Sequence, residues 1–457
     1  MNSKGKIISA GLLVAAVAAV GWLAISPPEL FRIGTNYSAK IVCTNVFVAG
    51  RDEADILKVD VQAPGNPFLK LITVKVDRDN KLVHANLLGF IGNGLAVYRP
   101  GTGCAAIPDG DIKTASAYQY TPQAIATPSA QLDWPAGSRE LTNDKIESII
   151  GQDNLTGPGI RAVAVIHQGK LIAQHYSPGF NQQIPLIGWS MTKTVNAALV
   201  GLQIQAGKLS LDQRNLWPTL SPSDGRENIT LANLLSMTSG LHFNENYGDV
   251  SDVTRMLYLE PDMASFVHNQ ALEHPPGTFW NYSTGTSTLL ARIWQQTEPA
   301  GALALPRERL FAPLGMASAI IEADARGNIA GGSYMYANAQ DWARFGQFLL
   351  QNGAWNGQQL LPEGFVEIMH TLEPASNGEY GKGQLWVQGP PGKDSDGSNP
   401  DLPFHLPADT YWLQGHDGQF VAIVPSLQLV MVRLGLTPDQ LHYQPQAMLA
   451  EVIKGLK

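Results

Sequence analysis

The sequence predicts a fold of the α+β class, in which an antiparallel sheet is assembled from both ends of one large domain. Strand-like apolar segments occur at residues 159–176 and again at 418–435, and the residues between them are mainly helical in pattern. Strands at both ends with helices between them are typical of this class. The chain of 457 residues is long enough for such a domain and a smaller one.

Residues 1–27 are predicted to be a membrane anchor or signal segment. Two lysines, Lys4 and Lys6, precede nineteen uncharged residues, 7–25. At about 1.5 Å per residue this run nearly spans a bilayer core of about 30 Å. A signal peptide would have a shorter apolar region and a small-x-small cleavage site, and this run ends without one, so we favour an uncleaved anchor. A buried core helix is the weakest alternative, because nothing upstream could cover it.

With the two lysines on the cytoplasmic side, the rest of the chain is expected to be exported to the periplasm or the cell exterior. Residues 38–107 are predicted to be a small β-rich module, in which Ile72, Val74 and Val76 alternate with polar residues before a turn at Asp79-Asn80. Residues 108–138 are rich in Pro, Ala, Ser and Thr without a period, which indicates a linker.

The chain has only two cysteines, Cys43 and Cys104, and both lie in this module. In an exported protein we expect them to pair and to stabilise the module by about 4 kcal/mol. Two buried free thiols are the alternative.

Residues 139–457 are predicted to form the large domain. A hairpin is expected to turn at Gln168-Gly169, and a helix from Ser190 to Ala206 is expected to stop at Gly207. Two apolar strands are broken at Pro425-Ser426, and a final helix follows from about Pro445 to Leu456.

The composition narrows the classes of function. Hydrophobic residues make up 44% of the chain and charged residues 15%, which predicts a buried core rather than disorder. The net charge of −8 argues against nucleic acid as a partner, since nucleic-acid binding depends on clustered Lys and Arg.

The first candidate site is the pair Ser190 and Lys193 at the start of the predicted helix. The spacing puts the lysine one helical turn above the serine, where a desolvated amine could accept the serine proton. The alternative is a helix N-cap followed by a solvated lysine.

The second candidate is Tyr282, which follows a Pro-Pro-Gly turn and precedes an apolar helix. It could act as a general base if a nearby ammonium lowered its pKa from about 10. A half-buried tyrosine with a hydrogen-bonded hydroxyl is the commoner case.

The third candidate is the glycine-flanked segment His416-Asp417-Gly418, which enters an apolar strand. A backbone amide there could donate to an oxyanion, whereas the simpler interpretation is a turn with an exposed histidine. The other nine histidines show no H-x-H, H-x-x-x-H or H-E-x-x-H spacing, which gives metal catalysis little support. Catalysis by a serine nucleophile needs neither a metal nor an organic cofactor, and we expect none.

In this order the three segments resemble the β-lactamase-related serine hydrolases, which include class C β-lactamases, DD-peptidases, esterases and 6-aminohexanoate-dimer hydrolases. The resemblance covers about residues 140–457. It extends to "ITLANLLSMTSGL" (229–241), "LFAPLGM" (310–316) and "GGSYMYANAQDWARFGQFLL" from Gly331. It implies an antiparallel sheet flanked by helices, with a helical subdomain.

The resemblance also implies roles for individual residues. Ser190 matches the family's nucleophile, Lys193 its paired lysine and Tyr282 the tyrosine of its Y-x-N motif. His416 to Gly418 stand where β-lactamases have K-T-G. The implied oxyanion hole is formed by the backbone amides of Ser190 and Gln419.

Two departures favour an amidase or esterase over a β-lactamase. Thr284 replaces the motif's Asn, which helps to hold the substrate amide, and His416 replaces the lysine that attracts the β-lactam carboxylate. We expect this imidazole to be largely neutral at neutral pH. The segment 242–253 resembles a loop of 6-aminohexanoate-dimer hydrolases, in which a tyrosine matching Tyr247 reaches the substrate amide. A surface loop is the alternative.

The sequence therefore predicts a membrane-anchored serine hydrolase that cleaves a small-molecule amide or ester through an acyl-enzyme. The alternatives are a β-lactamase or DD-peptidase that acts on penicillins or cell-wall peptides, and a non-catalytic relative that binds envelope peptides.

Overall fold

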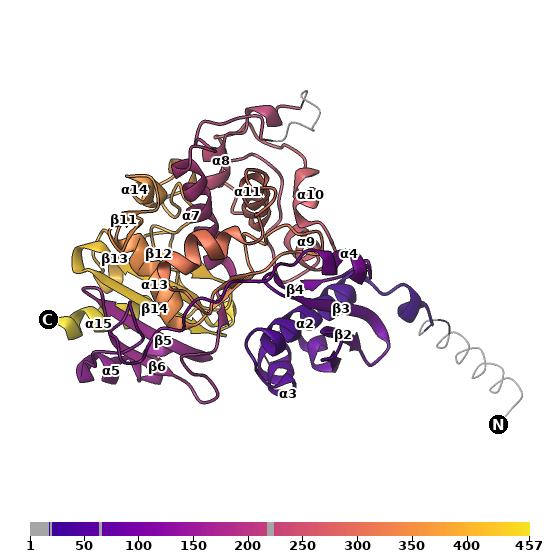
Figure 1. Cartoon of the computed structure of the whole chain (residues 1–457), viewed down its shortest axis with the longest axis horizontal. Coiled ribbons are helices and arrows are strands. Elements are labelled where there is room, and N and C mark those ends of the chain that lie inside the picture. Colours follow the sequence, from indigo (N-terminus) through magenta and orange to yellow (C-terminus); the bar gives the residue numbers. More distant parts are fainter. Residues whose placement is uncertain (1–17, 19–20, 64–65, 217–223) are drawn as a thin grey trace, which may run out of the picture.

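The computed structural model describes the chain except for residues 1–17, 19–20, 64–65 and 217–223. Figure 1 shows three parts: a sheet covered by helices, a mainly helical part above it and an N-terminal module at the side.

Five antiparallel strands form the main sheet in the order β12-β13-β14-β5-β6. Strands β5 (Ile160–His167) and β6 (Lys170–Tyr176) come from the start of the domain. Strands β12 (Tyr411–Gly415), β13 (Gln419–Val424) and β14 (Leu429–Gly435) come from its end. Because β14 pairs with β5, the two ends of the domain meet in the middle of the sheet, as the sequence predicts.

The β5–β6 hairpin turns at Gln168-Gly169, and both residues have positive φ angles (52° and 72°). A two-residue turn of this kind matches the twist of the flanking strands.

Helices cover both faces of this sheet. Helices α5 (Asp144–Ile150) and α15 (Gln446–Leu456) pack together on one face and share an apolar cluster with β5 and β14. Helix α13 (Ala339–Leu350) contacts β5, β13 and β14. The predicted final helix is confirmed, with its start at Gln446.

The helical part surrounds α11 (Thr284–Gln296), which contacts α7 (Thr192–Gln205), α8 (Leu231–Leu235), α9 (Asp252–Tyr258) and α10 (Met263–His268). The remaining short elements of this part of the chain are α6 (Asp153–Thr156), β7 (Leu186–Ile187), α12 (Ala312–Leu314), β8 (Ile320–Ile321), β9 (Met335–Ala337), β10 (Ala354–Trp355), β11 (Gln358–Gln359) and α14 (Phe365–His370). Strand β9 lies between β7 and β8 in a small sheet that leads into the candidate site.

The N-terminal module is a helix packed on a four-stranded antiparallel sheet. Its strands are β1 (Ile72–Asp77), β2 (Leu82–Leu87), β3 (Ile91–Arg99) and β4 (Gly103–Ala106), in sequence order. A short helix, α3 (Glu53–Ile56), precedes them.

Helix α2 (Glu29–Phe47) corrects the prediction of β structure from residue 38. It packs along β2, β3 and β4, and thirteen of its nineteen residues are buried. A disulfide joins Cys43 on α2 to Cys104 on β4, with a Cα–Cα distance of 6.0 Å.

Buried polar contacts join the module to the large domain, residues 139–457. Lys40 on α2 forms an ion pair with Glu322, and both side chains are almost fully buried. Glu322 also accepts hydrogen bonds from the Thr44 hydroxyl (2.9 Å) and the Cys104 amide (2.6 Å). The Arg99 guanidinium donates to the carbonyl of Asp324 at 2.8 Å. The module is therefore held against the rest of the molecule.

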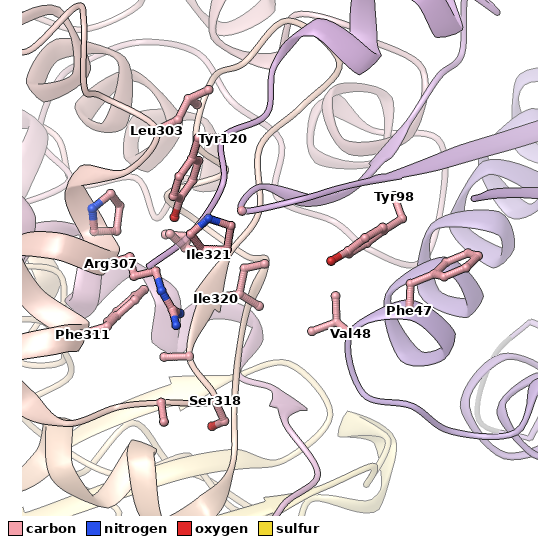
Figure 2. Close-up of a pocket in the computed structure, with 15 residues that line it drawn as sticks. Phe47, Val48, Tyr98, Tyr120, Leu303, Arg307, Phe311, Ser318, Ile320 and Ile321 are labelled. Atoms are coloured by element: carbon pink, nitrogen blue, oxygen red, sulfur yellow. The ribbon is translucent and has the colours of Figure 1, made fainter. Parts of the chain in front are cut away.

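The predicted linker is docked against the protein rather than extended in solvent. It contains α4 (Ile112–Ala117), and Trp134 is 2% exposed beneath the guanidinium of Arg344. A cavity of about 200 Å³ lies where the linker, the module and the large domain meet. Figure 2 shows Tyr98, Tyr120 and Phe311 among the residues around it.

Within the described part of the chain, no helix combines the length and apolar character needed to cross a bilayer. The anchor predicted over residues 7–25 lies mostly outside the described residues and stays a prediction.

Candidate active site

A strained turn presents Ser190 at the start of α7. The amide of Gly188 donates to the carbonyl of Met335 on β9 at 2.9 Å, and Trp189 adopts a φ of 46°, which is unusual for a non-glycine residue. A Cβ atom at Gly188 would come within 2.2 Å of the Trp342 ring, so only glycine fits there. Strain of this kind persists where the surrounding structure holds it, and it is concentrated at functional sites.

Lys193 is buried beside this serine and is 1% exposed. Its ammonium donates to the Ser190 Oγ at 2.9 Å, to the Thr284 Oγ1 at 2.8 Å and to the carbonyl of Gly332 at 3.0 Å. The alternative of a capping serine with a solvated lysine is therefore wrong. The Ser190 side chain caps no backbone amide of α7, whose N-cap residue is Met191.

Burial lowers the pKa of the Lys193 ammonium to about 8, against the opposing effect of the Glu245 carboxylate. A free lysine has a pKa of about 10.4, so Lys193 can be neutral near physiological pH. A neutral amine 2.9 Å from the Ser190 hydroxyl has the geometry of a general base.

Glu245 is the site residue that the sequence did not reveal. It accepts the hydroxyl hydrogen bond of Thr284 with one oxygen and the Thr284 amide at 2.8 Å with the other. Thr284 in turn accepts from Lys193, so a continuous chain of hydrogen bonds joins Ser190 to Glu245. The signal in the sequence that could have pointed to Glu245 is its position two residues before Tyr247, which was itself expected at the site.

The position of Thr284 differs from the prediction. At this position the family's motif has an asparagine that holds the substrate amide, so we expected Thr284 to take part in substrate binding, but it is 1% exposed and lies between Lys193 and Glu245. It connects these two groups instead.

Tyr282 lies next to the Ser190–Lys193 pair. The Lys193 Nζ is 4.8 Å from the centroid of its ring, and its hydroxyl interacts with that of Ser190. Burial, followed by the nearby Tyr380 and Glu245, raises the pKa of the phenol well above its usual value. The condition under which Tyr282 would act alone as the base, a lowered pKa, is not met, and the phenol is a neutral proton donor and acceptor.

The hairpin between β12 and β13 carries His416 to the other side of the site. Its Nδ1 is 3.2 Å from an oxygen of Asp439, and its Nε2 is 3.5 Å from an oxygen of Asp417. Burial would lower the pKa of His416, but Asp417 and Asp439 outweigh burial and raise it above the usual value. The imidazole therefore keeps its proton to a higher pH than we expected.

Tyr247 stacks on the His416 ring with a centroid distance of 4.8 Å and an interplanar angle of 17°. Its hydroxyl is 3.5 Å from the Thr284 Oγ1. Burial raises the pKa of this phenol, so Tyr247 is neutral as well. The structure thus brings Tyr247 close to the Lys193–Thr284–Glu245 chain.

Gln419 and Gly418 are the other two residues expected at the site. The Gln419 side chain and the Gly418 carbonyl form hydrogen bonds with residues of β14. The Gln419 amide group donates to the carbonyl of Gly435 at 2.7 Å, and its oxygen accepts from the Gly435 amide at 2.9 Å. Gly418 has a φ of 80°, and its carbonyl accepts from Arg433. Strands β12 and β13 contact the 189–191 turn, so the Gln419 backbone, rather than its side chain, is near the site.

One group among the described residues has the spacing to hold a metal ion: His416, Asp417 and Asp439, whose ligand atoms lie within 4.8 Å of one another. The three side chains form a mutual ion-pair cluster.

Comparison with known protein families places residues 154–439 in the family described as Beta-lactamase. The matched range is more than half of the chain and includes Ser190, Lys193, Tyr282 and His416. The chain belongs to the Beta-lactamase family. Family and fold together indicate a hydrolase of the serine acyl-enzyme type.

Solved structures agree on the fold. A Bacillus anthracis protein described as a 6-aminohexanoate-dimer hydrolase is 19% identical, with a TM-score of 0.57, and the match covers 76% of this chain and 94% of that one. A penicillin-binding protein homolog from Caulobacter crescentus is 14% identical, with a TM-score of 0.53 over 69% of this chain and 98% of that one.

EstCE1, described as a hydrolase with promiscuous acyltransferase activity, is 15% identical, with a TM-score of 0.53 over 68% of this chain and 97% of that one. These identities establish a shared fold and leave the substrate open. Comparison with curated proteins finds no match.

Proposed function

We propose that the protein is an amidase or esterase that works through an acyl-enzyme on Ser190. The observation that carries this proposal is the buried Lys193 amine, 2.9 Å from the Ser190 hydroxyl and with a pKa lowered to about 8. Nucleophilic catalysis by serine requires a base whose pKa is close to neutral pH and which is hydrogen-bonded to the serine hydroxyl.

In acylation, neutral Lys193 accepts the proton of Ser190 while the Ser190 Oγ bonds to the carbonyl carbon. The C–N or C–O bond to the leaving group then breaks, and the leaving group receives a proton through the Tyr282 hydroxyl. In deacylation, water attacks the ester carbon, gives up its proton by the same route and regenerates Ser190. The backbone amides of Ser190 and Gln419 are proposed to hold the oxyanion.

The substrate is proposed to be an amide or ester rather than a β-lactam. Thr284 is buried and hydrogen-bonded to Lys193, which argues against its acting as a substrate-binding asparagine would. Protonated His416 could attract a carboxylate, but Asp417 and Asp439 next to it offset that charge. Nitrocefin turnover on the order of 10 per second would instead favour a β-lactamase or DD-peptidase.

Labelling with a fluorophosphonate probe tests this proposal. We expect the native protein to be labelled and Ser190→Ala to lose all labelling, while Ser210→Ala, an exposed serine away from the site, keeps it. Undiminished labelling or turnover in folded Ser190→Ala would refute the assignment of the nucleophile.

We also propose that the enzyme acts outside the cytoplasm, attached to the membrane by residues 7–25. The disulfide between Cys43 and Cys104 supports export, since such bonds persist in oxidising compartments. Cell fractionation should find the full-length chain in membranes and resistant to high-salt extraction. Recovery of the protein from the soluble fraction would contradict the anchor.

A further inference from the structure

A cleft with a volume of about 690 Å³ adjoins the candidate site and lies between the N-terminal module and the hydrolase part (residues 139–457). Trp189, Tyr247 and His416, which belong to or adjoin the candidate site, are among the residues that line it. Trp189 directly precedes Ser190, so a substrate bound at the serine can extend an arm into this space. Pockets of this volume are typical of small-molecule sites.

The N-terminal module supplies the apolar wall of the cleft. Ile33 and Tyr37 come from α2, and Phe68 and Leu69 follow on the segment before β1. The Phe68 ring lies over Gly34, where a Cβ atom would come within 2.4 Å of it, and its centroid is 5.8 Å from that of Phe31. This wall is therefore a packed surface rather than a loose loop.

The hydrolase part supplies an acidic and aromatic wall. Four carboxylates line the cleft: Glu245, Asp249, Asp417 and Asp439. His416 is the one basic side chain among the lining residues, and two of those carboxylates, Asp417 and Asp439, already pair with it. A third, Glu245, offsets the charge of the neighbouring Lys193, so Asp249 carries most of the argument for a cation. No lysine or arginine is among the described residues that line the cleft.

The charges of the lining residues favour a positively charged ligand in the cleft. Low-dielectric walls concentrate the field of the carboxylates within the cleft. Tyr37, Phe68, Trp189, Tyr247 and Tyr258 add aromatic rings, whose faces attract cations. An anionic arm would meet carboxylates without a free cation to pair with.

We propose that this cleft holds a substrate arm made of an apolar chain with a terminal cation, and that the N-terminal module is the specificity element that contacts its chain. This inference rests on the proposed serine hydrolase function. It gives the module a role in substrate selection and narrows the substrate class to amides or esters that carry an amine or quaternary ammonium.

The test uses p-nitrophenyl esters of ω-substituted hexanoic acids on the full-length protein. The ω groups are trimethylammonium, its neutral isostere tert-butyl, and sulfonate. Each kcat/KM is divided by the value for p-nitrophenyl acetate on the same variant. We expect trimethylammonium to exceed tert-butyl by about tenfold, with sulfonate lowest. Equal values for the trimethylammonium and tert-butyl esters would overturn the proposal.

Two variants with matched controls locate the effect. Asp249→Asn should reduce the trimethylammonium-to-tert-butyl ratio about threefold, while Asp394→Asn, an exposed aspartate outside the cleft, leaves it unchanged. Phe68→Ala should reduce the preference for both long arms over acetate, while Phe90→Ala, on the same module but outside the cleft, does not. A trimethylammonium-to-tert-butyl ratio that stays at its native value in Asp249→Asn would overturn the proposal.

The conservative variant Phe68→Leu, with its melting temperature recorded, controls for misfolding of Phe68→Ala. It should retain an intermediate preference for long arms, and a native preference in both Phe68 variants would refute the role of the module. Hydrolysis of acetate without discrimination among the arms would overturn this inference alone. Absence of both hydrolysis and Ser190 labelling would overturn the proposed function itself.

Discussion

At the residue scale, the site depends on one buried amine. Lys193 has three hydrogen-bond acceptors and is almost fully buried, and its pKa is lowered to about 8. Its neutral form is the one that accepts the Ser190 proton. The two buried tyrosines next to it have raised pKa values and cannot replace it as the base near neutral pH.

The first prediction concerns the pH dependence of turnover. Because the base must be deprotonated, kcat/KM for an ester should rise as the pH rises and should level off above about 8. Stopped-flow or steady-state rates measured at constant ionic strength give this profile. A rate that falls through this pH range would contradict Lys193 as the base.

The second prediction concerns Glu245. Its carboxylate raises the pKa of Lys193, so Glu245→Gln should lower that pKa and move the rising limb of the profile to lower pH. A purely structural role would lower the rate without moving the limb. Glu273→Gln is the matched control, because Glu273 is exposed and contacts His242 instead.

The helical spacing of Ser190 and Lys193 predicted that the two side chains lie close together, whereas Tyr282 was assigned from the order of motifs that resembles the family. Glu245 could not be placed, since its role depends on contact with Thr284, 39 positions away. The raised pKa of Tyr282 could not be inferred from the sequence for a related reason. It depends on burial, which is a property of the assembled site and not of the local sequence.

At the element scale, the strands and helices of the hydrolase part follow the predicted order, because its hairpin and its strand breaks have clear turn signals. Helix α2 was not predicted. It is buried on most sides, so it lacks an amphipathic stripe, and its β-branched residues Ile41, Val42, Thr44 and Val46 are equally typical of a strand.

The third prediction tests the disulfide that ties α2 to β4. The double variant Cys43→Ser/Cys104→Ser should lose about 4 kcal/mol of stability, because the bond closes a long loop in the unfolded chain. Urea unfolding of the native protein with and without reductant, compared with the variant, measures this. Identical unfolding midpoints in all three samples would show that the bond contributes nothing.

At the scale of the whole molecule, the module and the hydrolase part share buried charges and enclose a cleft between them. The Lys40–Glu322 pair is central to this junction. The Tyr334 ring, from the segment that leads into β9, lies 4.1 Å from the Lys40 Nζ. The module therefore contacts, through Lys40 and Tyr334, the same segment whose Gly332 carbonyl accepts a hydrogen bond from Lys193.

The fourth prediction follows from this pair. Lys40→Met leaves Glu322 buried without its cation and should destabilise the protein by about 3–5 kcal/mol. Lys40→Met/Glu322→Leu removes both charges and should recover much of that loss. Thermal unfolding measures both variants, and an unchanged melting temperature in Lys40→Met would show that the pair does not hold the module.

The most direct test of the account is intact-protein mass spectrometry after rapid mixing with an activated ester and acid quenching. We expect a mass increase equal to one acyl group, mapped by peptide analysis to Ser190 and absent in Ser190→Ala. An acyl group on another residue, or hydrolysis without any covalent species at the earliest times, would contradict Ser190 as the nucleophile.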